Sequence, residues 1–298
     1  MEKSITEYQK CFNSIVYRLK KNEFVVAILV FGSMVNGDLW HGSDIDFLIV
    51  VNDENLSIEN IYTDENGIPV HLKVTGKKAF ISMYKDKLLR KKFNLLFRSS
   101  KLVFSKDKDI IALYDNVNYY NDLDREIWNL AYLGKILKYM SICKKYIAND
   151  RVYRAYVLSI KCLEQFAKLY VNHSGYIVSK DAIIVAMNLD DNFKNQVEDL
   201  FFSKSNKIES VKNIIKFLDN SINENIMEYT RFLVEYIKGR ENPLSVEDIK
   251  KEEVFANFHI NMKDILVKLW EKKIVKRKKK DYKVNKNIVL FEEWAYFL

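Results

Sequence analysis

The sequence predicts an α+β protein in which a small mixed β-sheet with flanking helices is followed by a helical bundle and then by a small domain of helices and strands. Two observations carry this prediction. Four segments of strand length lie early in the chain. They are a continuous apolar, β-branched-rich run at 24–31, a segment at 44–51 whose first residues are not apolar, an alternating segment at 68–74 and a short segment at 101–104. From about Asp122 onward the apolar residues recur instead at the spacing of amphipathic helices.

The predicted domains meet where this pattern changes. Residues 239–243, Gly-Arg-Glu-Asn-Pro, form the strongest linker signal in the chain because they combine helix-terminating and turn-forming residues. Short helical segments and strand-like segments follow them. We therefore expect domains at residues 1–120, 121–240 and 241–298.

Composition excludes several classes of protein. The chain has 298 residues, of which 48% are hydrophobic and 30% charged, as is typical of globular domains rather than disordered segments. No apolar run approaches eighteen residues and the N-terminus lacks a signal-peptide core, so we expect a cytoplasmic protein with no membrane partner. The widely spaced Cys11, Cys143 and Cys162 predict reduced core thiols. The net charge of +8 favours anionic partners such as nucleotides or nucleic acid.

Helical spacing indicates the remaining elements. A helix over 4–20 begins with a capping box formed by Ser4 and Glu7. A second helix over 79–97 carries basic residues that either attract a triphosphate or nucleic-acid backbone or form a solvated face. These residues are Lys85, Lys87, Arg90, Lys91 and Lys92. In the predicted bundle, helices are expected at 125–147, 151–171, 190–202, 208–218 and 222–238, the first two antiparallel.

The buried strand at 24–31 ends at Gly32-Ser33. A glycine at this point lets a ligand approach the backbone closely. If Ser33 begins a short helix, its free N–H groups and its hydroxyl are available to a phosphate. Residues 36–38, Asn-Gly-Asp, then predict a turn. The sequence therefore predicts a phosphate-binding corner at Gly32 and Ser33.

Two carboxylates follow at the start of the next strand. Asp44 and Asp46 share one strand face, about 6.6 Å apart, and would repel each other by roughly 2.5 kcal/mol at an effective dielectric of 20. A cation between them offsets that repulsion, and oxygen ligands suit Mg²⁺ or Mn²⁺ beside nucleotide phosphates. The alternative is that both are solvated residues at a strand end.

The Gly-Ser step and the Asp-x-Asp pair, which begins eleven residues after the serine, together resemble the signature of the DNA polymerase beta-like nucleotidyltransferase superfamily. The branch of this superfamily that the sequence resembles most is the small bacterial one that includes the minimal and antibiotic-modifying nucleotidyltransferases. The resemblance rests on residues 24–51, with weaker support to about residue 115.

This resemblance implies both a reaction and its site residues. Gly32 and Ser33 would hold the triphosphate with help from Ser43, and Asp44 and Asp46 would hold the divalent ion. A nucleoside monophosphate would move from a nucleoside triphosphate to an acceptor hydroxyl on a small molecule, a protein or an RNA.

One departure from the family pattern affects the expected chemistry. The family normally supplies a third carboxylate from a following strand, whereas residues 70–74 contain none. His71 stands at the matching position and is a candidate catalytic base, and Lys73 would repel a second metal ion. Asp64 and Glu65 lie in the hairpin turn, where we expect them to be out of reach. Either two carboxylates and one ion suffice, the strand is misplaced, or the domain binds nucleotide without turnover.

The last reading gives an alternative function: a nucleotide-sensing or nucleic-acid-binding regulator with a degenerate transferase core. Its nucleic-acid contact would come from the C-terminal domain. There a helix at 262–272 and a hairpin with a basic tip at 278–281 resemble a winged helix-turn-helix. The helix would enter a DNA major groove with Arg277 and the tip on phosphates, or the domain would serve packing or dimerisation with a solvated tip. Residues 289–298 are expected to pack back on the domain.

Overall fold

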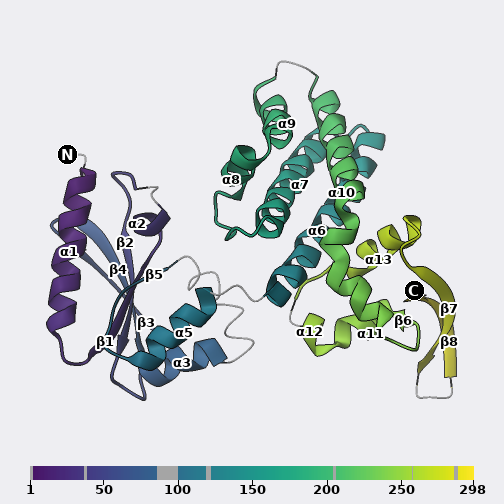
Figure 1. The fold of residues 1–298 in the computed structure, drawn as a ribbon. Coiled ribbons are helices and arrows are strands. Elements are labelled where there is room, and N and C mark those ends of the chain that lie inside the picture. Colours follow the sequence, from purple (N-terminus) through teal and green to yellow (C-terminus); the bar gives the residue numbers. More distant parts are fainter. Residues whose placement is uncertain are drawn as a thin grey trace. The chain divides into compact units, whose positions relative to one another are not determined.

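The computed structural model describes residues 3–36, 39–85, 100–118, 122–203, 206–256, 258–284 and 288–298. It forms two compact units, Met1–Tyr120 and Asn121–Leu298. The α+β class is confirmed, since a five-stranded mixed sheet is followed by helices and then by a small sheet (Figure 1). The predicted turn residues Gly37 and Asp38, and the basic residues Lys87, Arg90, Lys91 and Lys92, lie outside the described residues.

The N-terminal sheet has the strand order β3-β4-β2-β1-β5. Its strands are β1 (Val25–Phe31), β2 (Ile45–Val51), β3 (Glu59–Glu65), β4 (Ile68–Gly76) and β5 (Lys101–Ser105). The central strand β2 runs antiparallel to β1 and parallel to β4. The C-terminal end of β1, which leads into the Gly-Ser step, therefore lies beside the start of β2 in the middle of the sheet. β3 joins β4 through Asn66 and Gly67, whose φ angles of 54° and 71° suit a tight hairpin turn.

Helices cover both faces of this sheet because its strands are apolar on both sides. The helix α1 (Ile5–Lys21) packs on the face that carries Ile28, Phe47 and Val70. The opposite face carries Leu29 and Leu48 and is covered by α3 (Lys77–Lys85) and α5 (Lys108–Asn118). Asp46 lies two positions before Leu48 and therefore on this second face, at the start of β2.

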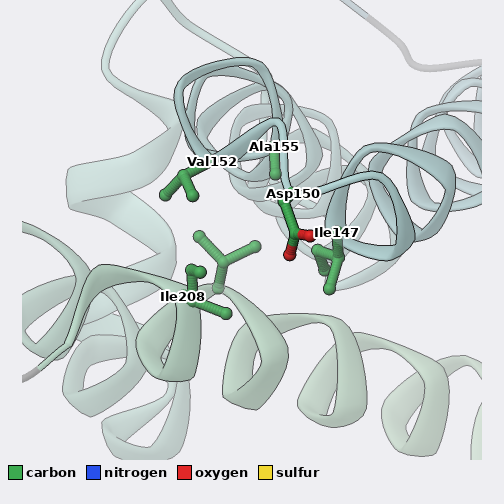
Figure 2. Close-up of a pocket in the computed structure, with 6 residues that line it drawn as sticks. Ile147, Asp150, Val152, Ala155 and Ile208 are labelled. Carbon is green, nitrogen blue, oxygen red and sulfur yellow. The ribbon is translucent and has the colours of Figure 1, made fainter.

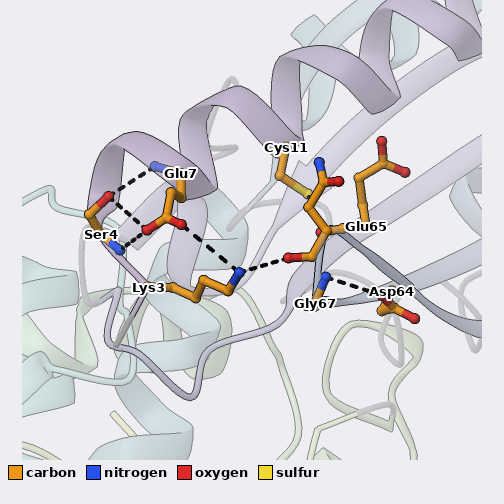
Figure 3. A network of polar contacts seen from close by, with 8 residues as sticks. Lys3, Ser4, Glu7, Cys11, Asp64, Glu65 and Gly67 are labelled. Carbon is orange, nitrogen blue, oxygen red and sulfur yellow. Dashed lines mark hydrogen bonds and ion pairs between the residues drawn. The ribbon is translucent and has the colours of Figure 1, made fainter. Parts of the chain in front are cut away.

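The predicted capping box at the start of α1 is present, and it anchors the helix near the β3–β4 hairpin (Figure 3). The Ser4 hydroxyl accepts a hydrogen bond from the Glu7 N–H at 3.3 Å, and the Glu7 carboxylate accepts one from the Ser4 N–H at 2.7 Å. The Lys3 ammonium donates to the Asn66 carbonyl at 2.8 Å. The first helix and the hairpin are therefore tied together by side-chain contacts.

In the part of the second unit that the structure describes, five helices come first. They are α6 (Asp122–Ala148), α7 (Val152–His173), α8 (Ala182–Leu189), α9 (Asp191–Phe202) and α10 (Lys207–Lys238). The helix α8 was not predicted. The prediction of two helices at 208–218 and 222–238 was wrong, because α10 is one helix of 32 residues. Leu218 and Ile222 are both buried and four residues apart, so the apolar stripe of α10 continues through the polar segment 219–221 that was interpreted as a break.

The helices α6 and α7 form the predicted antiparallel pair. The Cys143 thiol donates to the Ala155 carbonyl at 3.3 Å near one end, and the Asn172 amide donates to the Asn129 side-chain oxygen at 2.7 Å near the other. The turn between them passes through Asp150, whose φ is 52°. Figure 2 shows this turn facing Ile208 of α10 around a small pocket with a mostly apolar lining.

The C-terminal segment adds a three-stranded sheet with the order β6-β8-β7. Its elements are β6 (Leu244–Ser245), α11 (Val246–Lys251), α12 (Glu253–Ala256), α13 (Met262–Glu271), β7 (Lys276–Val284) and β8 (Ile288–Phe297). The hairpin is longer than predicted, because Lys278 and Asp281 pair with Ala295 and Glu292 in mid-strand instead of forming its tip. The segment expected only to pack back supplies the strand β8.

The C-terminal segment and the helices before it share one hydrophobic core. Lys268 of α13 donates to Asp219 of α10 at 2.9 Å, and Gly134 of α6 lies against the backbone of Asn261. The separate domain boundary near residue 240 therefore stays a prediction.

All three cysteines are buried and free, as predicted. Among the described residues, no helix combines the length and the apolar character needed to cross a membrane.

Candidate active site

The predicted corner lies at the C-terminal end of β1. Gly32 has a φ of 73°, and the short helix α2 (Ser33–Asn36) follows it directly. The Ser33 hydroxyl donates to the carbonyl oxygen of Asp44 at 3.4 Å. This contact brings the Gly-Ser step beside the first residues of the Asp-x-Asp segment, as the sequence predicted.

The carboxylate of Asp46 packs directly against Gly32. Phe31 of β1 pairs with Asp46 of β2, and a Cβ atom added to Gly32 would lie only 2.4 Å from Asp46 Oδ2. No L-residue side chain fits at this position while Asp46 keeps its place. The Asp46 side chain is 17% exposed, whereas Asp44 is exposed at the strand start. Burial raises the pKa of Asp46, the nearby charge of Asp44 raises it further, and the hydrogen bond from His71 acts in the opposite direction.

His71 lies beside Asp46 on the neighbouring strand. The parallel register pairs the two residues, and His71 Nδ1 is 3.0 Å from Asp46 Oδ1. The other ring nitrogen, Nε2, is 3.2 Å from the side-chain oxygen of Asn60 and 3.3 Å from the ammonium nitrogen of Lys73. The Tyr62 ring stacks on the imidazole with centroids 4.4 Å apart. His71 is thus held from both nitrogens and from one face.

The contributions of Asn60 and Tyr62 were missed by the sequence reasoning. Both lie on β3, where the sequence of residues 58–63 is compatible with either a short strand or a short helix. The Asn66-Gly67 turn fixes the hairpin register, pairing Tyr62 with His71 and Asn60 with Lys73. Counting outward from that turn would have identified both residues.

Asp64 and Glu65 precede β4, the strand on which the family's third carboxylate is expected. Both have other partners. Asp64 Oδ1 accepts a hydrogen bond from the Gly67 N–H at 3.2 Å. The Glu65 carboxylate accepts from the Ser14 hydroxyl at 3.1 Å and pairs with Arg18 of α1. Both therefore serve the hairpin and its contact with α1.

Ser43 is placed in the turn that leads into the Asp-x-Asp segment. Its side chain is buried, and its hydroxyl oxygen accepts a hydrogen bond from the Trp40 N–H at 3.1 Å. Its carbonyl accepts from the Tyr8 hydroxyl of α1 at 2.9 Å. These contacts make Ser43 a residue that fixes the position of Asp44, its neighbour in sequence.

Asp44 and Asp46 suit one ion that is shared with a substrate. Mg²⁺ typically takes one or two protein carboxylates together with substrate phosphates and water. Within the described part of the chain, no three His, Cys, Asp or Glu residues are grouped so as to enclose a metal ion. The packing of Asp46 Oδ2 on Gly32 directs a carboxylate oxygen toward the corner where a phosphate is expected. The donor set therefore fits a shared ion and lacks a third protein carboxylate.

Comparison with known families agrees with this geometry. Residues 13–109 match the family described as "Polymerase beta, Nucleotidyltransferase". That range contains the Gly-Ser corner, both aspartates and His71. Residues 13–109 of the N-terminal unit therefore form a domain of this nucleotidyltransferase family. The resemblance inferred from the sequence is thereby confirmed.

The nucleotidyltransferase domain and the second unit together also have a structural relative. The chain is similar to the nucleotidyltransferase-like protein from Exiguobacterium sibiricum 255-15, whose crystal structure was determined at 1.90 Å resolution. The TM-score is 0.64 at 13% identity, with 97% of this chain and 99% of that chain covered. This likeness concerns the fold alone. No protein of curated function matches the sequence.

Proposed function

We propose that the protein is a divalent-metal-dependent nucleotidyltransferase that transfers a nucleoside monophosphate from a nucleoside triphosphate to an acceptor hydroxyl. The packing of the Asp46 carboxylate on Gly32 is the observation that carries this proposal. It joins the two parts that the reaction requires, an acidic pair and a phosphate-binding corner. The acceptor is a small molecule, a protein side chain or an RNA end.

In this reaction the acceptor oxygen forms a bond to the α-phosphorus while the bond from that phosphorus to the bridging oxygen breaks. Pyrophosphate leaves with the bonding electrons, and the acceptor proton passes to a base or to water. Gly32 and Ser33 bind the β- and γ-phosphates through backbone N–H groups and the hydroxyl. Asp44 and Asp46 would hold Mg²⁺ or Mn²⁺, which, when bound, neutralises the developing charge and lowers the pKa of the acceptor hydroxyl.

We assign His71 to the positioning of Asp46. Its Nδ1 contact to Oδ1 leaves Oδ2 on the side of Gly32. A role as general base would require Nε2 to leave Asn60 and Lys73, which occupy it in this structure. Ser43 supports the same site by holding the turn before Asp44.

A regulator with a degenerate core is the second candidate function. One specific observation favours it: His71 and Lys73 stand where the family's third carboxylate is expected, and Lys73 adds positive charge beside the imidazole. The C-terminal segment would then contact nucleic acid. Its helix α13 buries Met262, Ile265, Leu266 and Leu269, and Lys268 is engaged by Asp219, so the exposed basic strand β7 is the better candidate surface for phosphates.

The transfer of labelled nucleotide distinguishes the two functions. Purified protein is incubated with each α-labelled nucleoside triphosphate, with Mg²⁺ or Mn²⁺, and with a cell extract fractionated into metabolites, proteins and RNA. We expect label in one acceptor fraction together with released pyrophosphate, and neither product with the Asp44→Asn variant. Tight triphosphate binding without pyrophosphate release in any fraction would instead support the regulator.

A further inference from the structure

A groove lies between the last turn of α6 and the first half of α10, within the second unit. Its volume is about 370 Å³, which is in the range of small-molecule sites. The helices contribute residues at matching spacings of three and four, so each helix presents a single face to the groove. These residues are Lys144, Ile147 and Ala148 of α6 and Lys212, Ile215 and Lys216 of α10.

The groove combines an apolar surface with exposed ammonium groups. Ile215 is buried and Ile147 is half-buried, and both belong to the hydrophobic core of the second unit or pack against it. The three lysines are exposed, so their alkyl chains can line the groove while their charged ends stay in water. This lining suits a ligand that has an apolar part and an anionic part.

The nearby carboxylates are engaged elsewhere or paired only weakly. Asp219 also lines the groove, and it accepts a hydrogen bond from Lys268 of α13 at 2.9 Å. Glu209 lies 3.8 Å from Lys212, but both side chains are more than half exposed, so their ion pair is weak. The groove therefore keeps an excess of positive charge.

This excess favours an anion with more than one charge. Lys212 and Lys216 are four residues apart on α10 and repel each other, and Lys144 adds a third charge from α6. Neither Lys144 nor Lys216 forms a hydrogen bond or an ion pair with any residue that the structure describes. A phosphate monoester carries a charge of about −1.5 to −2 and three acceptor oxygens, whereas a carboxylate carries a single charge. Phosphate is therefore the better match.

We propose that this groove binds a small molecule in which a phosphate group is attached to an apolar or aromatic body. The phosphate oxygens would accept hydrogen bonds from the ammonium groups of Lys144, Lys212 and Lys216. The apolar body would cover Ile147 and Ile215. The site lies in the second unit alone, so it does not depend on nucleotide transfer by the first unit.

Isothermal titration calorimetry of the whole chain with naphthyl phosphate tests the groove. EDTA is present throughout, because it removes the divalent ion on which the corner at Gly32 depends. We expect the wild type to bind naphthyl phosphate at least about ten-fold more tightly than either inorganic phosphate or naphthol, since each of these lacks one half of the ligand. Lys144→Met and Lys216→Met should each weaken binding by about ten-fold, because each loses a charge-assisted hydrogen bond.

Two further variants separate the groove from the rest of the surface. Lys145→Met removes an exposed lysine beside Lys144 that does not line the groove, and it should bind as the wild type does. Ala148→Leu fills the groove without changing its charge and should weaken binding, with thermal unfolding as the check on folding. The proposal is overturned if the wild type does not bind naphthyl phosphate or binds inorganic phosphate or naphthol equally well. It is also overturned if Lys144→Met and Lys145→Met have equal affinities, as binding at the Gly32 corner or by surface charge alone would produce.

Discussion

Alanine at position 32 is expected to abolish metal-dependent triphosphate binding and to destabilise the N-terminal unit by about 1–3 kcal/mol. The new methyl group would lie 2.4 Å from Asp46 Oδ2, so the carboxylate must leave the corner. The φ of 73° adds strain for any residue other than glycine. Isothermal titration calorimetry with magnesium and a triphosphate measures the binding, and urea unfolding measures the stability.

Gly67→Ala is the matched control for this variant. Gly67 has a similar φ of 71°, but the nearest atom to its added Cβ would be the Lys3 ammonium nitrogen at 3.7 Å. It should therefore show the backbone strain without loss of triphosphate binding. Wild-type affinity in Gly32→Ala would contradict the placement of the triphosphate at this corner.

Asparagine at position 46 is expected to lower nucleotide transfer by roughly 10³-fold, the equivalent of about 4 kcal/mol of lost transition-state stabilisation. The amide keeps the shape of the side chain, and its oxygen can still accept the hydrogen bond from His71, so the fold should persist. The rate of label incorporation into the acceptor fraction measures the effect, and circular dichroism monitors folding.

Asp64→Asn serves as the control for Asp46→Asn. Asp64 is a nearby carboxylate whose oxygen accepts from the Gly67 N–H in the hairpin turn. It should leave transfer within about two-fold of the wild-type rate, since an amide oxygen can accept the same bond. Full activity in Asp46→Asn would show that this carboxylate is not part of the chemistry.

The centre of the site was predictable because its signals are local in sequence. The run at 24–31 is apolar throughout, which identifies a buried strand, and a glycine, which adopts a positive φ without strain, directly follows it. Asp44 and Asp46 then open the next strand, so the antiparallel pairing of Phe31 with Asp46 follows from the short connection between the two strands. Along β4, Val70, Leu72 and Val74 alternate with His71 and Lys73, so the sequence also indicates that the histidine and the lysine share one strand face.

Features that depend on contacts between distant elements were missed or wrong. Residues of β3 are mostly exposed, so their apolar pattern does not identify a strand, and the pairing with β4 is what forms it. The polar segment 219–221 of α10 was interpreted as a break, whereas Lys268 of α13 compensates Asp219 there. The basic residues of β7 were assigned to a hairpin tip because their partners on β8 lie many residues away in sequence.

Thermal stabilisation by a nucleoside triphosphate, with and without Mg²⁺, in the wild type and in Asp44→Asn tests the central claim most directly. Asp44 is exposed at the start of β2, so its replacement should leave the fold intact. The account predicts that Mg²⁺ increases the stabilisation of the wild type by the triphosphate and that this increase is absent in Asp44→Asn. A magnesium-dependent increase of the same size in both proteins would show that the acidic pair does not hold the metal–triphosphate complex.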